Sequence, residues 1–276
     1  MIDAKKKYYY ENRKQIIEIL TSNLKQPIIS ISYNNNNYDV DLRLKGKEFE
    51  TLYGQNDFNS RIDCNEIIDI IVKPINFPKT GFFIDNSNIR TFLSKNSEGK
   101  KVLNLCSYTC TLGAIARTNG ATSVINVDKN GGFLELGKDI YRKQKPKIVF
   151  EDSEFINKDV NEYLDSIPKN DEFDIIILDL PEISPIPCNF INTENTYRSI
   201  NKKCLKRLSQ NGILITSCCS HGFRRERYQR VISNVIAGTD FYIDKECVFD
   251  KLEDHPIKVG DSNSDYLKIY VLKRKI

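Results

Sequence analysis

Apolar positions follow two periods along the main part of the chain. Between residues 102 and 217, short runs rich in Val, Ile and Phe predict buried strands, and apolar residues three or four apart predict helices between them. The expected strands cover residues 102–105, 123–127, 148–150, 173–178 and 212–217. The expected helices cover residues 112–117, 131–143, 160–166 and 194–208. This alternation predicts parallel strands joined by right-handed crossovers, and therefore a doubly wound, mostly parallel α/β sheet.

The pattern before this region is different. Apolar positions within residues 10–24 predict an amphipathic helix, which Pro27 ends. Residues 28–33 and 38–44 alternate apolar and polar side chains on either side of the asparagine run 34–37. Because asparagine tolerates the positive φ of tight turns, this segment predicts a β-hairpin.

A boundary is expected at residues 74–78, where two prolines interrupt the pattern. We therefore expect a small N-terminal α+β region, residues 1–75, as a candidate RNA-binding part, and a main domain, residues 76–276. Residues 241–249 and 266–273 predict two more strands, antiparallel at the sheet edge.

Composition places the chain among ordinary globular proteins. It has 276 residues, of which 40% are hydrophobic and 28% charged. The longest apolar runs are far shorter than the roughly 20 residues of a membrane span. The N-terminal residues contain no apolar stretch typical of a secretory signal, so we expect a cytoplasmic protein without a membrane partner. Its eight cysteines are then expected to be free thiols, and without a CxxC pair they predict no metal site.

The net charge of +4 is compatible with a nucleic-acid partner without demonstrating one. Basic residues cluster at residues 5–7, 142–145, 202–207 and 224–228. Each cluster can be a solvated helix face or a set of phosphate contacts, and the first is the commoner outcome.

Polar side chains follow the expected strands. In a doubly wound sheet the ligand binds beyond the carboxyl ends of the strands. Asp128 ends the second strand, and a carboxylate there suits the two hydroxyls of a ribose. The loop after the first strand lacks the glycine patterns that cradle a diphosphate. Dinucleotides and nucleotide triphosphates are therefore disfavoured, and a nucleoside without phosphate, such as S-adenosylmethionine, remains as a candidate ligand.

Several segments also occur in the order of a known family. The chain resembles class I S-adenosylmethionine-dependent methyltransferases, and is similar to the bacterial and archaeal ribosomal RNA cytosine-C5 methyltransferases with a Ser-Cys-Ser-His motif. The resemblance rests on Thr80-Gly81-Phe82-Phe83-Ile84-Asp85 with Arg90, Val102 to Thr109, Ile175 to Pro181, Thr216-Ser217-Cys218-Cys219-Ser220-His221, and Asp254-His255-Pro256 with Tyr266-Leu267-Lys268. It implies a Rossmann-like methyltransferase domain acting on RNA.

The resemblance also implies a set of cofactor-binding residues. Asp128 would hold the ribose, Asp159 would reach the adenine amine, and Arg90 would lie near the cofactor's carboxylate. Asp179 would contribute to the cofactor site and open the target-base pocket. The methionine part would be lined by the segment after the first strand, namely Asn104, Ser107, Tyr108 and Thr109.

The resemblance makes Cys219 the nucleophile and Asp179 the second catalytic residue. A thiolate that adds to C6 of cytosine makes C5 nucleophilic, and a carboxylate near N3 and N4 favours the adduct. Strand alternation would turn Cys218 into the packing on the opposite face. The chain departs from the family at Cys110, where glycine is usual and a Cβ threatens cofactor fit, and at Leu180, where the usual motif is Asp-Pro-Pro.

Three functions remain open from the sequence. The first is methylation of cytosine C5 in large-subunit ribosomal RNA. The second is methylation of a guanine nitrogen in ribosomal RNA, which needs no thiol. The third is an inactive, RNA-binding pseudo-methyltransferase. The oligomeric state is also open, a homodimer included.

Overall fold

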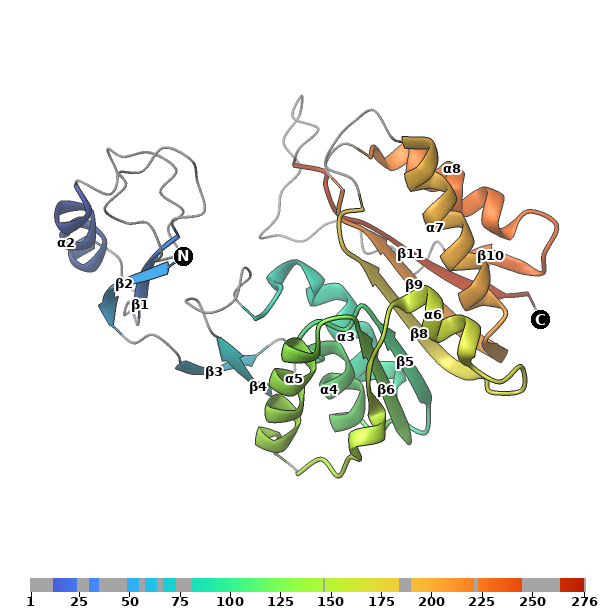
Figure 1. The fold of residues 1–276 in the computed structure, drawn as a ribbon, viewed down its shortest axis with the longest axis horizontal. Helices are drawn as coiled ribbons and strands as arrows, with labels where there is room; N and C mark the ends of the chain where they lie inside the picture. Colours follow the sequence, from blue (N-terminus) through green and yellow to red (C-terminus); the bar gives the residue numbers. More distant parts are fainter. Residues whose placement is uncertain are drawn as a thin grey trace. The chain divides into compact units, whose positions relative to one another are not determined.

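Figure 1 shows the computed structural model of the protein, which describes residues 12–23, 30–34, 49–54, 58–63, 67–72, 81–145, 147–183, 190–220, 223–244 and 264–275. In chain order the elements are α2 (Arg13–Asn23), β1 (Ser30–Asn34), β2 (Phe49–Gly54), β3 (Phe58–Asp63), β4 (Ile67–Val72), η2 (Ile84–Asn86), α3 (Ser87–Asn96), β5 (Lys101–Leu105), α4 (Thr111–Thr118), β6 (Ser123–Asp128), α5 (Gly131–Lys143), η3 (Asp152–Glu154), β7 (Phe155–Asn157), α6 (Val160–Ser166), β8 (Phe173–Leu180), α7 (Phe190–Leu205), β9 (Leu208–Cys218), α8 (Arg225–Ile236), β10 (Phe241–Ile243) and β11 (Lys268–Arg274).

The chain divides into two compact units, one of Met1–Arg61 with Asp69–Phe82 and one of Ile62–Ile68 with Phe83–Ile276. The expected N-terminal helix is present as α2. Strand β1 pairs antiparallel with β2, so its partner is further along the chain than the hairpin prediction placed it. The expected partner, residues 38–44, lies outside the described residues. Strands β3 and β4 form a second two-stranded sheet.

The main sheet has seven strands in the order β10-β11-β9-β8-β5-β6-β7. Strands β5 to β9 run parallel to one another, whereas β11 runs antiparallel to both β9 and β10. The predicted doubly wound, mostly parallel sheet is therefore confirmed. The two C-terminal strands are antiparallel as expected, but β11 lies inside the sheet and only β10 forms the edge.

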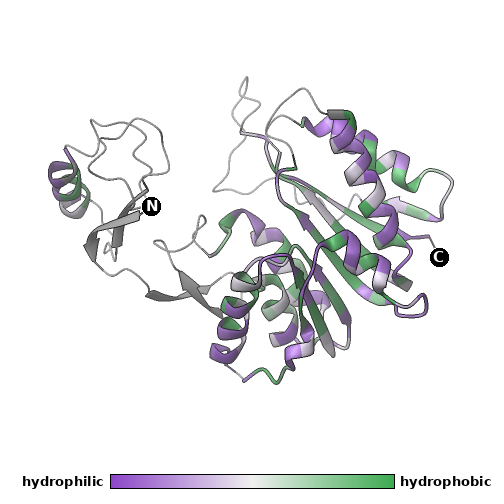
Figure 2. Ribbon diagram, in the orientation of Figure 1, coloured by the Kyte–Doolittle hydropathy of each residue, from purple (hydrophilic) through white to green (hydrophobic). Residues whose placement is uncertain are grey.

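Helices cover this sheet in two sets, α3 to α5 and α6 to α8, and within each set neighbouring helices pack on each other (Figure 1). A buried cluster joins α6, α7 and α8 to alternate strand residues, including Leu103 and Leu105 of β5 and Ile176 and Leu178 of β8. Figure 2 shows the matching pattern, with apolar central strands and helices of mixed hydropathy. Among the described helices, none is both long enough and apolar enough to cross a lipid bilayer.

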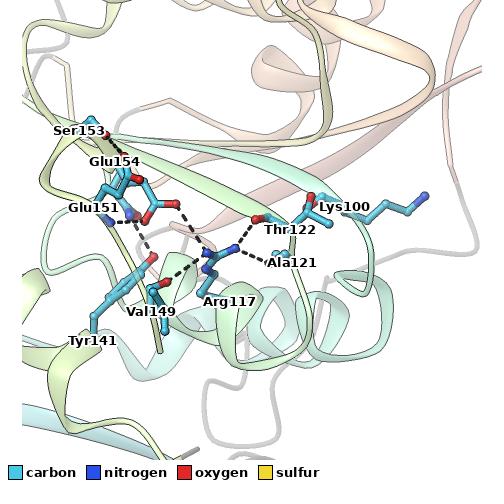
Figure 3. A network of polar contacts seen from close by, with 10 residues as sticks. Lys100, Arg117, Ala121, Thr122, Tyr141, Val149, Glu151, Ser153 and Glu154 are labelled. Atoms are coloured by element: carbon cyan, nitrogen blue, oxygen red, sulfur yellow. Dashed lines mark hydrogen bonds and ion pairs between the residues drawn. The ribbon is translucent and has the colours of Figure 1, made fainter. Parts of the chain in front are cut away.

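One predicted strand is wrong. Residues 148–150 form no regular strand, and the edge strand is β7, a few residues later. The guanidinium of Arg117 on α4 donates to the backbone carbonyl of Val149 at 3.0 Å, and also to the carbonyls of Ala121 and Thr122 (Figure 3). The ring of Phe150 packs on Tyr141 of α5. Contacts with the side chains of Arg117 and Tyr141 therefore fix residues 148–150, in place of the strand pairing that the apolar pattern predicted.

The Arg117 contacts predict a measurable contribution to stability. Arg117→Met removes charge-assisted hydrogen bonds to three carbonyls, and should lower the free energy of unfolding by about 2–3 kcal/mol in urea titrations. Arg142→Met is the control, because its ion pair with Asp139 is half exposed and is expected to contribute less than about 1 kcal/mol. Equal losses in the two variants would contradict the role given to Arg117.

Candidate active site

The carboxyl ends of four strands meet at one edge of the sheet. Leu105 at the end of β5 lies between Val127 of β6 and Leu178 of β8, and Asp179 of β8 lies opposite Ser217 of β9. Cys106, directly after β5, interacts electrostatically with Asp128, Asp159 and Asp179. Burial, and then these carboxylates, raise the pKa of its thiol well above the usual value. The predicted acidic residues therefore all contribute to the electrostatic environment of Cys106.

The loop between β5 and α4 has an unusual backbone. Its residues Cys106, Tyr108 and Cys110 have φ values of 55°, 48° and 56°, and they are the non-glycine residues with positive φ in the described part of the chain. Each left-handed residue with a Cβ costs about 1–2 kcal/mol. The loop is held by hydrogen bonds from the Ser107 amide to the Val127 carbonyl at 3.0 Å and from the Cys110 amide to the Ser107 carbonyl at 2.8 Å. Strain concentrated in one loop is typical of a functional segment.

Cys110 adopts a left-handed backbone conformation, which glycine adopts more readily, and its side chain points away from the strand ends. Its thiol is fully buried, lies 3.6 Å from the Ser107 hydroxyl, and packs on α5 at Gly137. A Cβ on Gly137 would lie 2.5 Å from this sulfur. Burial raises the pKa of the Cys110 thiol to about 12. Gly137 of α5 therefore leaves the room that the buried Cys110 side chain occupies. The structure gives no support to the expectation that Cys110 obstructs a ligand.

This fit can be tested by a double-mutant cycle. Gly137→Ala should lower the free energy of unfolding by about 1–3 kcal/mol, because the new methyl group overlaps Cys110. In a Cys110→Gly background the overlap with Cys110 is removed and alanine favours the helix by about 1 kcal/mol, whereas the Thr109 carbonyl oxygen stays 3.3 Å from the new Cβ. The same change should therefore cost clearly less than in the wild type. Additive effects in urea denaturation, within about 0.5 kcal/mol, would contradict the proposed contact.

The four residues expected to line a methionine moiety differ in environment. The Asn104 side chain donates to Asn126 at 3.0 Å, and Asn126 donates to the Tyr141 hydroxyl, so this amide belongs to the buried layer under α4 and α5. Ser107 and Thr109 are also buried. The ring of Tyr108 lies between those of Phe83 and Phe133, with centroid distances of 5.2 Å and 4.6 Å. Asn104 thus connects β5 to β6 and α5, while the tyrosine forms part of an aromatic cluster.

Asp128 is oriented by the backbone. Its two carboxylate oxygens accept hydrogen bonds from the amides of Tyr108 and Asn130, each at 2.9 Å. A carboxylate has about four acceptor positions, so each oxygen can accept one more donor. Asp159 is exposed and caps α6, accepting from the Asn161 amide at 2.8 Å. Asp128 therefore has a fixed geometry suited to paired hydroxyl donors, and Asp159 has a structural role that the sequence analysis did not assign.

Asp179 is oriented by two side chains. Asn86, the last residue of η2, donates to one carboxylate oxygen at 3.0 Å, and the Ser217 hydroxyl donates to the other. Asn86 was missed as a site residue, although it lies between Asp85 and Arg90, two of the residues on which the family resemblance rests. Leu180 is buried in the cluster with α7 and α8, so its side chain points away from Asp179. Leu180 in place of the usual proline therefore leaves the Asp179 carboxylate at the carboxyl end of β8.

The two adjacent cysteines lie in different environments. Cys218 ends β9, is fully buried and belongs to the cluster under α7 and α8, which confirms its predicted packing role. Cys219 is half-buried, and its sulfur lies 3.6 Å from the Leu180 carbonyl. His221 and Thr80 lie outside the described residues. Cys219 is therefore the cysteine of this pair that is partly accessible at the strand ends.

Arg90 and two arginines of the basic cluster at residues 224–228 make internal contacts. Arg90 is buried on α3 and donates to the carbonyls of Phe83 and Ile84 at 2.6 Å and 3.1 Å. In the basic cluster, Arg225 pairs with Asp265 and Arg227 pairs with Glu194, each at 2.5 Å. These arginines support the fold, and a contact between Arg90 and a cofactor carboxylate stays a prediction. Among the described residues, no cluster of His, Cys, Asp and Glu could hold a metal ion.

Comparison with known proteins defines the class. The S-adenosylmethionine-dependent methyltransferase family matches residues 71–223, more than half of the chain. The chain therefore belongs to this family, whose cofactor is S-adenosylmethionine. A proposed SAM-dependent methyltransferase from Streptococcus mutans has the same fold, with a TM-score of 0.77 and 21% identity over 98% of this chain and 68% of that one.

Two curated relatives are more similar in sequence. Ribosomal RNA large subunit methyltransferase I of Aeromonas hydrophila is 29% identical over 78% of this chain and 54% of the relative. A proposed ribosomal RNA large subunit methyltransferase of Methanocaldococcus jannaschii is 32% identical over 69% of this chain and 48% of the relative. The chain thus spans about half the length of the curated relatives it matches.

Proposed function

We propose that this protein methylates C5 of a cytosine in large-subunit ribosomal RNA, with Cys219 as the nucleophile. The observation that carries the proposal is the half-buried Cys219, which follows β9 at the same sheet edge as Asp128 and Asp179. The names of the curated relatives support ribosomal RNA as the substrate class. The mildly basic chain, with a net charge of +4, is compatible with that partner.

The residues at the ends of β5 and β6 fit the family's cofactor. The Asp128 carboxylate has both oxygens oriented and can accept from the two ribose hydroxyls. Tyr108, which the resemblance assigns to the methionine part of the cofactor, belongs to an aromatic cluster with Phe83 and Phe133 and lies in the loop that follows β5. When bound, S-adenosylmethionine supplies an electrophilic methyl group on a sulfonium sulfur.

Cys219 would act on the base itself. Its thiolate forms a bond to C6 of cytosine, and the electron pair of the C5–C6 double bond becomes available at C5 for the methyl group. A general base then removes the C5 proton, the C–S bond breaks, and the thiolate and the double bond are restored. The thiol appears in this sequence only as a transient nucleophile, so no oxidant or reductant is consumed.

Asp179 would orient the target base. Its carboxylate oxygens are fixed by Asn86 and Ser217, at the strand end adjacent to Cys219. A carboxylate in this place can accept a hydrogen bond from the exocyclic amine of cytosine and take part in proton transfer at N3 as the adduct forms. Asn86 is then a positioning residue, because it acts on the base only through Asp179.

The cofactor assignment predicts weaker binding in one variant. Asp128→Ala removes the acceptor proposed for the ribose, and a charge-assisted hydrogen bond contributes about 1.5–3 kcal/mol. Calorimetry with S-adenosylhomocysteine should therefore show an affinity lower by about tenfold or more. Asp139→Ala, an exposed change on α5, is the control and should bind normally. Unchanged affinity in folded Asp128→Ala would reject the assignment.

The nucleophile assignment predicts that the two cysteine variants fail differently. Cys219→Ala should fold and bind S-adenosylhomocysteine but lose methyl transfer, whereas Cys218→Ala should keep activity and lose about 1–2 kcal/mol of stability. RNA containing 5-fluorocytosine should trap a covalent complex with the wild type and not with Cys219→Ala, because fluorine cannot leave as the C5 proton does. Trapping can be followed as a stable shift on a denaturing gel.

Two outcomes would replace the proposal. Methyl transfer retained by Cys219→Ala would exclude the thiol mechanism and favour a guanine nitrogen as the target. Failure of the wild type to bind S-adenosylhomocysteine, together with retained RNA binding, would favour an RNA-binding protein without catalysis.

A further inference from the structure

Asp85 and Tyr266 belong to two segments on which the family resemblance rests, and the proposed reaction steps use neither residue. Asp85 lies in η2, and Tyr266 lies two residues before β11. The Tyr266 hydroxyl donates a hydrogen bond to the Asp85 carboxylate at 2.6 Å, across 181 positions of the chain. This length is typical of a hydroxyl that donates to a carboxylate. The bond therefore joins the segment before the first strand of the main sheet to the segment before its last strand.

The residues on either side of Tyr266 are anchored to α8. Arg225 donates to both carboxylate oxygens of Asp265, at 3.1 Å and 2.5 Å. The same guanidinium donates to the Leu267 carbonyl at 3.2 Å. Tyr266 therefore extends from a short segment whose position is fixed before and after it.

The start of β11 lies at the edge of the sheet where β8 and β9 end. Cys218 of β9 has Leu180 of β8 as its partner on one side and Lys268 of β11 on the other. The buried Lys268 ammonium group donates to the Ser220 carbonyl at 2.8 Å, and so ties the start of β11 to the segment after β9. The tyrosine before this strand is therefore placed at the strand ends.

Element η2 receives contacts from three parts of the chain. Arg90 of α3 donates to two backbone carbonyls at its start, and Tyr266 donates to Asp85 in its middle. Asn86, the next residue, is buried and donates to the Asp179 carboxylate at 3.0 Å. A 3₁₀ helix of three residues has few hydrogen bonds of its own, so its orientation depends on such side-chain contacts.

Building on the function proposed above, we infer that Tyr266 and Asp85 are positioning residues for the reaction: their hydrogen bond fixes η2, and thereby the Asn86 side chain that orients the Asp179 carboxylate. Asp85 and Tyr266 are both partly exposed, so the bond between them acts on local order more than on global stability. A displacement of about 1 Å at a positioning group can lower a rate by about 100-fold.

The test measures methyl transfer by the full chain from radiolabelled S-adenosylmethionine to ribosomal RNA from cells that lack this protein. Tyr266→Phe removes the hydroxyl alone, and should lower kcat by about tenfold. KM for the RNA and the affinity for S-adenosylhomocysteine should change by less than about twofold, because the pair touches neither ligand. Asp85→Asn keeps an acceptor for the hydroxyl and should retain more activity than Asp85→Ala.

A double-mutant cycle connects the pair to Asp179. If Tyr266 acts through Asn86, then Tyr266→Phe should change kcat by less than about twofold in an Asn86→Ala background. The same loss in both backgrounds would overturn the inference, because the tyrosine would then act independently of Asn86. Tyr242→Phe is the matched control, since Tyr242 is exposed on the edge strand β10, and it should keep the wild-type kcat.

Hydrogen exchange gives a readout that needs no activity. In Tyr266→Phe, amides of residues 83–90 should exchange about tenfold faster than in the wild type, whereas those of β10 should keep their rates. Wild-type exchange at residues 83–90 would overturn the inference. If the wild type transfers no methyl group to ribosomal RNA, or if Cys219→Ala retains transfer, the proposed function fails, and the exchange rates still decide whether the pair fixes η2. The two failures are therefore distinguishable.

Discussion

The register between β8 and β9 is the constraint on which the candidate site depends. Side chains alternate between the two faces of a strand, so Asp179 and Ser217 share one face while Leu180 and Cys218 are buried under α7 and α8. A slip of one residue would move the carboxylate into the apolar layer and the leucine out of it. The apolar packing of the α6–α8 layer therefore also determines which polar groups reach the strand ends.

The sequence was sufficient for the central strands and for the residues that follow them. Long apolar runs such as residues 173–178 favour the interior of a parallel sheet, and Asp128 and Asp179 lie at the carboxyl ends of the strands that such runs form. Residues 148–150 have a similar composition, yet Arg117 binds the Val149 carbonyl and Phe150 packs on Tyr141. A side chain from a distant helix decides this case, and local periodicity contains no information about it.

The site details that were missed depend on contacts between distant parts of the chain. Asn86 is related to Asp179 only through a hydrogen bond across 93 positions, and Lys268 to Ser220 across 48. Cys110 was expected to interfere with a ligand because a single position was compared with its family. Its effect is determined by Gly137 on α5, which leaves room for the sulfur. Departures from a family motif are thus interpretable only together with the residues that pack on them.

The place of β11 in the sheet has a consequence for how the protein is made. This strand follows β10 in the chain but is inserted between β10 and β9. As a polypeptide emerges from the ribosome, β9 must wait for the β11 segment with one edge unpaired, and exposed edges invite incorrect association. The carbonyl of Ser220 acquires its lysine donor at the same moment. Ordering of the segment that follows β9 is therefore coupled to the pairing of β11 with β9.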